Sequence, residues 1–81
     1  SASTPDRNRF QLRVGPNPAS ETLYIDVPFK GVCRINTLQG ATQWTDTFIE
    51  PGQHQVAVGS WPRGMYIVTF DGGYTAKVCL E

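Results

Sequence analysis

The sequence MYIVTFDGGYTAKVCL, at residues 65–80, is the strongest indication of the fold class of this chain. Its first part, 65–70, is the most apolar run in the sequence, and its β-branched and aromatic residues favour a strand. Asp71-Gly72-Gly73 is a tight turn signal, and apolar residues then alternate with Thr75, Lys77 and Cys79. The stretch therefore predicts a β-hairpin whose first strand is central in its sheet and covered on most of its surface.

The same alternation extends upstream of the hairpin. It predicts strands at 10–14, 23–27, 32–36, 41–49 and 54–58, with Gly or Pro between them, and it places Leu23, Ile25, Val27, Cys33 and Ile35 on inner faces. Seven short strands without any helical period predict an all-β fold, a seven-stranded antiparallel sandwich of immunoglobulin-like type. A closed barrel is the weaker alternative.

Length and charge limit the classes of function. The 81 residues form one domain at most, and composition divides them into a polar linker at 1–9 and a folded domain at 10–81. Seven basic residues balance seven acidic ones and are scattered, which argues against nucleic acid as a partner. No apolar run approaches the roughly 20 residues of a transmembrane segment. We expect a signal peptide, if the chain is exported, to lie upstream in a longer protein.

Candidate chemical groups are few. His54 is the only histidine and stands between two glutamines, so the sequence predicts a surface or strand-edge role for it and no metal site. The serines and threonines have no base beside them, so no hydrolase triad can be assembled. We therefore predict no catalytic, cofactor-binding or metal-binding residues, and no enzyme activity.

The two cysteines are predicted to remain apart. Alternation places Cys33 on an inner face and Cys79 on the outer face of the last strand, as an exposed thiol, so that their Cβ atoms point in different directions. A disulfide is disfavoured for this reason. Tyr66 stands at the entrance to the apolar strand. Immunoglobulin-like sandwiches often place a tyrosine corner there, a tyrosine whose hydroxyl bonds to the backbone of the preceding crossover, and we predict this role for Tyr66. Trp61 is expected to be partly buried, whereas the sequence does not decide whether Trp44 is a core residue or a surface one.

Four phrases occur in a fixed order along the chain: PNPAS at 16–20, LQG at 38–40, WPRGMY at 61–66, and an apolar last strand. In order and spacing they resemble the C-terminal sorting domain of the type IX (Por) secretion system of Bacteroidetes. The chain differs from the family pattern at Trp61, where leucine is usual, and in its acidic final residue, where a basic one is frequent. The positions that match the motifs are Pro16, Asn17, Pro18, Leu23, Gly40, Gly64, Tyr66, Lys77, Val78 and Leu80.

The resemblance implies a secretion signal for an upstream cargo. Such a domain passes through the periplasm, is recognised by the outer-membrane translocon, and reaches the cell surface or the medium. A surface sortase and attachment complex then cuts in the linker, here 1–9, and joins the cargo to anionic lipopolysaccharide. The altered tail is compatible with a domain that is retained instead of cleaved.

Two further expectations concern binding. The alternative function is an immunoglobulin-like adhesion or carbohydrate-binding module, which would carry a line of exposed aromatics such as Tyr24, Trp44 and Trp61. The last strand, 74–81, carries little charge, so we expect an open sheet edge there and a weak or strand-swapped homodimer.

Overall fold

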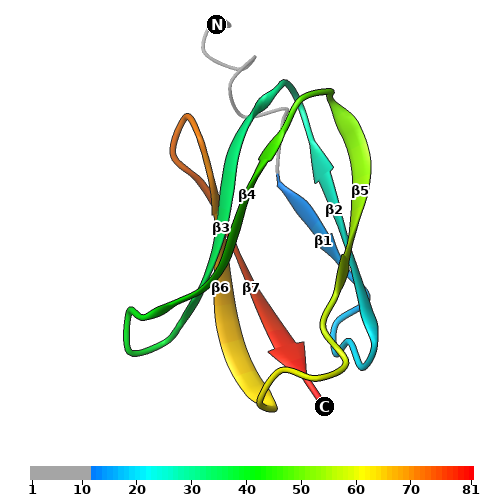
Figure 1. Ribbon diagram of the computed structural model, residues 1–81, viewed down its shortest axis with the longest axis vertical. Coiled ribbons are helices and arrows are strands. Elements are labelled where there is room, and N and C mark those ends of the chain that lie inside the picture. The colour runs from blue at the N-terminus through cyan, green and yellow to red at the C-terminus, as the bar shows by residue number, and fades with distance from the viewer. Residues whose placement is uncertain (1–11) are drawn as a thin grey trace, which may run out of the picture.

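The computed structural model describes residues 12–81, which form seven strands (Figure 1). In chain order they are β1 (Arg13–Gly15), β2 (Thr22–Val27), β3 (Gly31–Thr37), β4 (Thr42–Phe48), β5 (Gly52–Ala57), β6 (Gly64–Phe70) and β7 (Tyr74–Leu80). No helix occurs among the residues described. The prediction of an all-β fold with seven strands is confirmed.

The strands form two antiparallel sheets (Figure 1). One has three strands in the order β1-β2-β5, and the other has four in the order β4-β3-β6-β7. The first sheet aligns Leu23 of β2 with Val56 of β5, and the second aligns Ile35 of β3 with Val68 of β6. These partners are apolar residues of the faces that the alternation assigned to the interior, so the hydrophobic pattern fixes the register.

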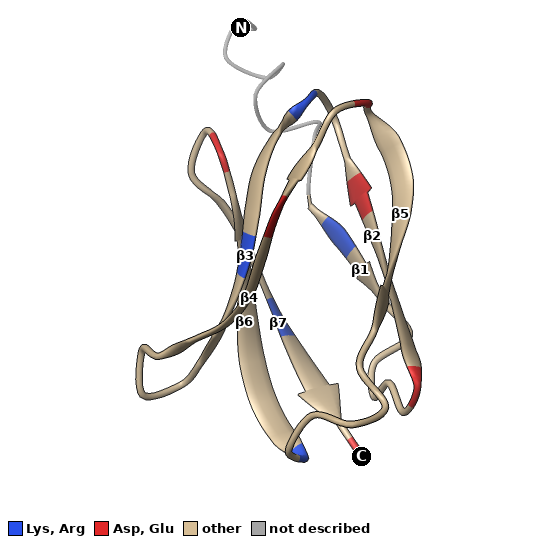
Figure 2. Ribbon diagram, in the orientation of Figure 1, with Lys and Arg blue, Asp and Glu red and all other residues tan. Residues whose placement is uncertain are grey.

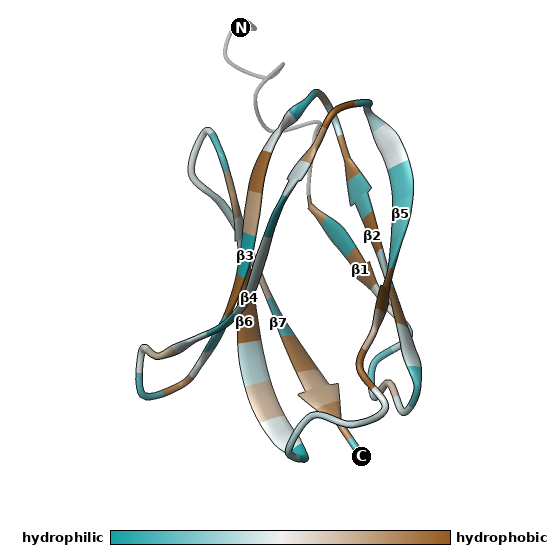
Figure 3. Ribbon diagram, viewed as in Figure 1, coloured by the Kyte–Doolittle hydropathy of each residue, from teal (hydrophilic) through white to brown (hydrophobic). Residues whose placement is uncertain are grey.

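One core lies between the two sheets. Along β2 and β3, hydrophobic and hydrophilic residues alternate (Figure 3), and the hydrophobic ones are buried. All five inner-face residues predicted upstream of the hairpin are buried, as are Val68, Val78 and Leu80 from the second half of the chain. At roughly 25 cal/mol per Å² of apolar surface removed from water, this cluster is the main source of stability for so small a domain.

Strand β6 corrects one expectation. It lies between β3 and β7, so its central position is confirmed. Tyr66, Val68 and Phe70 are buried, but Met65 is 40% exposed and Ile67 is only half-buried. The run is apolar on both faces, yet no described element packs on its outer face. Strand β6 is therefore covered on one face only, contrary to the prediction.

The first strand is shorter than predicted. Strand β1 begins at Arg13, with buried Leu12 before it, whereas positions 10 and 11 and the predicted linker at 1–9 lie outside the described residues. After Gly15 the chain leaves the three-stranded sheet and reaches the other one, where Ala19 forms a parallel bridge with Leu80. Segment 16–20 thus connects the two sheets at their shared edge.

The turn at 71–73 joins β6 to β7 as predicted. Gly72 and Gly73 have φ values of 96° and 89°, a region that favours glycine because it has no Cβ. The Asp71 carboxylate accepts a 2.9 Å hydrogen bond from the Val32 amide, which ties the turn to the start of β3.

The charged residues of the described part are scattered over both sheets and their loops (Figure 2). Within residues 12–81, no helix is long and apolar enough to cross a membrane.

Candidate functional site

All four sequence phrases come to one end of the sandwich (Figure 1). Segment 16–20, the crossover 58–64 between β5 and β6, and the end of β7 at 78–81 lie there together, and turn 38–40 projects to one side of the same end. We call this region the motif end. Antiparallel pairing explains the arrangement, because alternate connections and the end of the last strand fall on the same side of a sandwich.

Segment 16–20 is joined to the end of β7 by three hydrogen bonds. The Cys79 amide donates to the Asn17 Oδ1 over 3.0 Å, the Ala19 amide donates to the Cys79 carbonyl, and the Glu81 amide donates to the Ala19 carbonyl, both over 2.9 Å. Pro16 and Pro18 have no N–H, so they leave no unpaired donor along this edge. The expectation of an open edge at the last strand is wrong over residues 79–81, which this segment covers.

Tyr66 forms the predicted tyrosine corner. Its hydroxyl donates a 2.6 Å hydrogen bond to the main-chain oxygen of Pro62, and the side chain is only 3% exposed. Trp61 packs against it, with ring centroids 5.7 Å apart, and is half-buried as expected. The hydroxyl therefore satisfies a carbonyl of the crossover, which forms no part of either sheet ladder.

Arg63 makes the largest set of side-chain hydrogen bonds at the motif end. Its Nη1 donates to the main-chain oxygens of Ser20 (2.8 Å) and Glu81 (3.4 Å). Its Nη2 reaches the carbonyls of Val58, Gly59 and Trp61 at 2.6, 3.3 and 2.8 Å, and its Nε donates to Trp61 over 3.1 Å. The motif pattern leaves this position variable, so Arg63 was not among the predicted site residues. The sequence alone does not distinguish an arginine that bonds to main-chain oxygens of a turn from one that points into solvent.

The LQG turn at 38–40 and the WPRGMY segment at 61–66 both contribute to the lining of a shallow cavity of about 300 Å³. Leu38 and Gln39 of the β3–β4 turn line it together with Gln43, Met65 and the segment around Arg63. Leu38 is 52% exposed, and Gly40 completes the turn with a φ of 97°. This cavity thus places two exposed apolar side chains, Leu38 and Met65, beside each other at the motif end.

Residues 13–79 match the family described as the secretion system C-terminal sorting domain. This chain belongs to that family. No match was found among the curated proteins or among the solved structures. The family is one of type IX sorting signals and not of enzymes, and it implies export across the outer membrane by the type IX machinery.

The predicted motif residues of this sorting domain divide by environment. Leu23, Tyr66, Val78 and Leu80 belong to the core, Gly40 and Gly64 occupy turns or strand starts with positive φ, and Pro16, Asn17, Pro18 and Lys77 are exposed. The four exposed residues are accessible at the surface, as is Gly40, whereas the four core residues are not.

The cysteines of the sorting domain are both free. Cys33 is buried, and this burial raises the pKa of its thiol to about 12, with a smaller contribution from the negative charge of Asp46. Cys79 is half-buried, so the prediction of an exposed thiol is wrong. Segment 16–20 bonds to the main chain of this residue, and Met65 lies directly opposite it on β6.

His54 lies on β5, an edge strand, in agreement with the predicted strand-edge role. Its ring stacks on Phe48 with centroids 4.0 Å apart, and Nε2 is 2.7 Å from the Glu50 carbonyl oxygen. Within residues 12–81, no group of three or more His, Cys, Asp or Glu side chains is placed to hold a metal ion. From β5 the histidine packs on the end of β4 and on the loop that joins β4 to β5.

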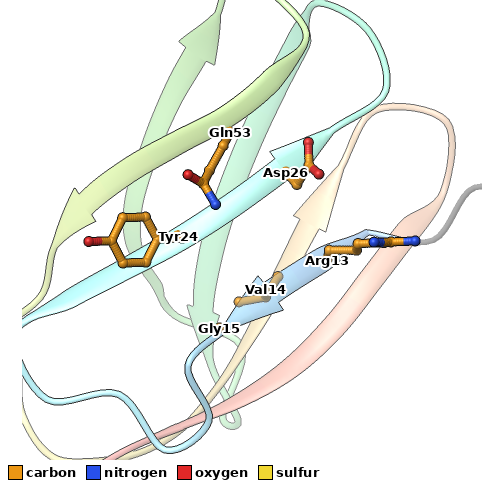
Figure 4. A pocket seen from close by; sticks show the side chains of 6 residues that line it. All are labelled: Arg13, Val14, Gly15, Tyr24, Asp26 and Gln53. Atoms are coloured by element: carbon orange, nitrogen blue, oxygen red, sulfur yellow. The ribbon is translucent and has the colours of Figure 1, made fainter.

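The three aromatics of the alternative function do not form a line. Tyr24 is 36% exposed on β2 and borders an open depression of about 390 Å³ with Arg13, Asp26 and Gln53 (Figure 4). Trp44 lies on β4 in the other sheet and packs half-buried against the core, and Trp61 packs on Tyr66. Of these three residues Tyr24 alone is exposed, where an extended binding face would need several aromatics together.

Proposed function

We propose that this domain is the export signal of an upstream cargo and that the type IX outer-membrane translocon reads it in the folded state. The family match over residues 13–79 carries the proposal. The assembly of four distant phrases into one end of the sandwich supports it, because residues that serve one recognition event need to lie on one surface.

The proposed contacts are exposed residues of the motif end together with Lys77, which lies just before it on β7. Pro16, Asn17 and Pro18 lie beside the covered edge of β7, and Lys77 is exposed two residues before Cys79 on the same strand. Gly40, Gly64, Leu23, Tyr66, Val78 and Leu80 contribute by holding the surface in shape. We propose the same division for the domain itself, with 10–81 as the signal and 1–9 as the linker in which a surface sortase would cut.

The fold is proposed to be of immunoglobulin-like type. The tyrosine corner at Tyr66 supports this assignment. The start of the described chain supports it too, because β1 pairs with β2 in one sheet and Ala19 then pairs with Leu80 of β7 in the other. In this arrangement one end of the sandwich gathers alternate loops, which is where such folds place their recognition residues.

The test is a reporter fused to the N-terminal side of the chain and preceded by a signal peptide. In a type IX-competent cell we expect the reporter at the surface or in the medium, and in an isogenic strain without the translocon we expect it in the periplasm. A loss of about 9 kDa from the surface-exposed product would show cleavage, and an unchanged mass would show retention. Equal surface display in both strains would contradict the proposal.

A further inference from the structure

The guanidinium of Arg63 donates hydrogen bonds to three chain segments at the motif end. Its acceptors are Ser20, which closes segment 16–20, Glu81, which follows β7, and the crossover residues Val58, Gly59 and Trp61. Among the side chains described, it donates to all three segments at once. The other links at this end join the segments two at a time, as the Ala19 amide does to the Cys79 carbonyl.

The chemistry of these contacts requires an arginine. Five main-chain oxygens surround one planar group that has five N–H donors in a fixed fork. A lysine has the same charge but presents three donors from a single nitrogen, which does not reproduce the spread of the arginine fork over these five oxygens. Hydrogen bonds from a charged donor to carbonyls are also stronger than neutral ones. The site therefore depends on the geometry of the guanidinium and not on its charge alone.

The acceptors are groups that the sheets leave unpaired. Ser20 and Glu81 lie just outside β2 and β7, and the crossover between β5 and β6 has no ladder partner. Carbonyls at such positions take donors from water, from a side chain or from a turn, as the Val58 carbonyl also does from the Trp61 amide. When Arg63 supplies the donors, the positions of Ser20 and Glu81 become fixed relative to the crossover, and the exposed residues beside them take one arrangement.

We infer that Arg63 is a positioning residue of the sorting signal, which holds segment 16–20 and the end of β7 in the arrangement that the export machinery reads. This inference rests on the proposed function. It differs from a general stabilising role in where the effect falls: removal of the guanidinium loosens the motif end and leaves the centre of the sheets intact.

The test compares Arg63→Lys and Arg63→Gln with the wild type, using Arg34→Gln as the matched control. Arg34 is exposed on β3, and its guanidinium donates no hydrogen bond to another described residue. Amide hydrogen exchange is measured on the 81-residue chain. Exchange should accelerate roughly 3- to 10-fold at Ala19, Cys79 and Glu81 in both Arg63 variants, and stay unchanged at Ile35 and Val68. The control should exchange like the wild type.

Export is measured on the reporter fusion in a type IX-competent cell. Surface display should fall in both Arg63 variants and remain at the wild-type level in Arg34→Gln. Full display of Arg63→Lys together with loss in Arg63→Gln would overturn the inference, because charge alone would then suffice. Unchanged exchange with lost display would overturn it as well, since Arg63 would then contact the receptor directly.

Two further outcomes separate the inference from the proposed function. Faster exchange with normal display in both variants would overturn the positioning role and leave the sorting function intact. Failure of the wild-type fusion to reach the surface would overturn the sorting function itself, and with it the role of Arg63 in recognition.

Discussion

The side-chain oxygen of Asn17 accepts a 3.0 Å hydrogen bond from the amide of Cys79, a residue 62 positions further along the chain. This bond joins the first motif of the family to the last strand, and it gives a structural reason for the asparagine between two prolines. The Cys79 amide needs an acceptor, and within this tripeptide the side-chain oxygen of Asn17 supplies it. The two motifs are therefore parts of one surface.

Asn17→Ala should destabilise the chain by about 0.5–1.5 kcal/mol, because the Cys79 amide loses its acceptor. The free energy of unfolding in urea measures this effect. Ser20→Ala is the matched control, since the Ser20 contact described involves its main-chain oxygen. Equal midpoints for Asn17→Ala and the wild type would show that water replaces the side chain without loss.

Tyr66→Phe should cost about 1–2 kcal/mol in the free energy of unfolding, because the part-buried Pro62 carbonyl loses a 2.6 Å donor while the ring remains. Tyr24→Phe, at an exposed tyrosine on β2, should change the same quantity by much less. A denaturation midpoint for Tyr66→Phe that matches the wild type would contradict the tyrosine corner.

Cys33 should make stability depend on pH above about 9. An exposed cysteine thiol has a pKa of 9.0, and burial in the fold raises the pKa of Cys33 to about 12, so between these values the unfolded chain releases a proton that the folded chain keeps. Fewer protons on the unfolded state means that stability falls as pH rises. The difference in unfolding free energy between about pH 8 and about pH 10.5 should therefore be smaller in Cys33→Ala than in the wild type. An identical pH dependence in both chains would contradict the assignment.

Self-association should be weak and should use β4 instead of β7. The end of β7 is covered by segment 16–20, whereas β4 is the opposite edge of the same sheet and carries only Asp46 as a charged residue. Sedimentation under reducing conditions should show a concentration-dependent shift that Thr47→Lys removes. A strict monomer for the wild type at high concentration would argue against this homodimer.

Most of the fold could be predicted because period-two alternation records which face of each strand is buried. Leu23, Ile25 and Ile35 follow that rule. Strand β6 departs from this rule, because an apolar run indicates burial but does not show whether another element of the fold will cover each face of the strand. Met65 and Ile67 are apolar on a face that no described element covers.

The candidate site was less predictable, because its links are long-range and involve no repeating pattern. The bridge between Ala19 and Leu80 joins a proline-rich segment to a strand, and a segment of this composition has no alternation to reveal pairing. Arg63 was missed for a related reason: its partners are carbonyls, which every residue has, so nothing in the sequence marks them. Tyr66 could be predicted because its partner lies only four residues away.

Recognition of this chain by the type IX export machinery should require only the folded domain. Its decisive test is binding of the 81-residue chain to the detergent-solubilised outer-membrane translocon, with membranes from an isogenic strain without the translocon as the reference. We predict saturable binding to the translocon preparation, no saturable binding to the reference, and competition by excess unlabelled chain. Equal binding to both preparations, or no binding to either, would contradict recognition of the folded domain by the translocon.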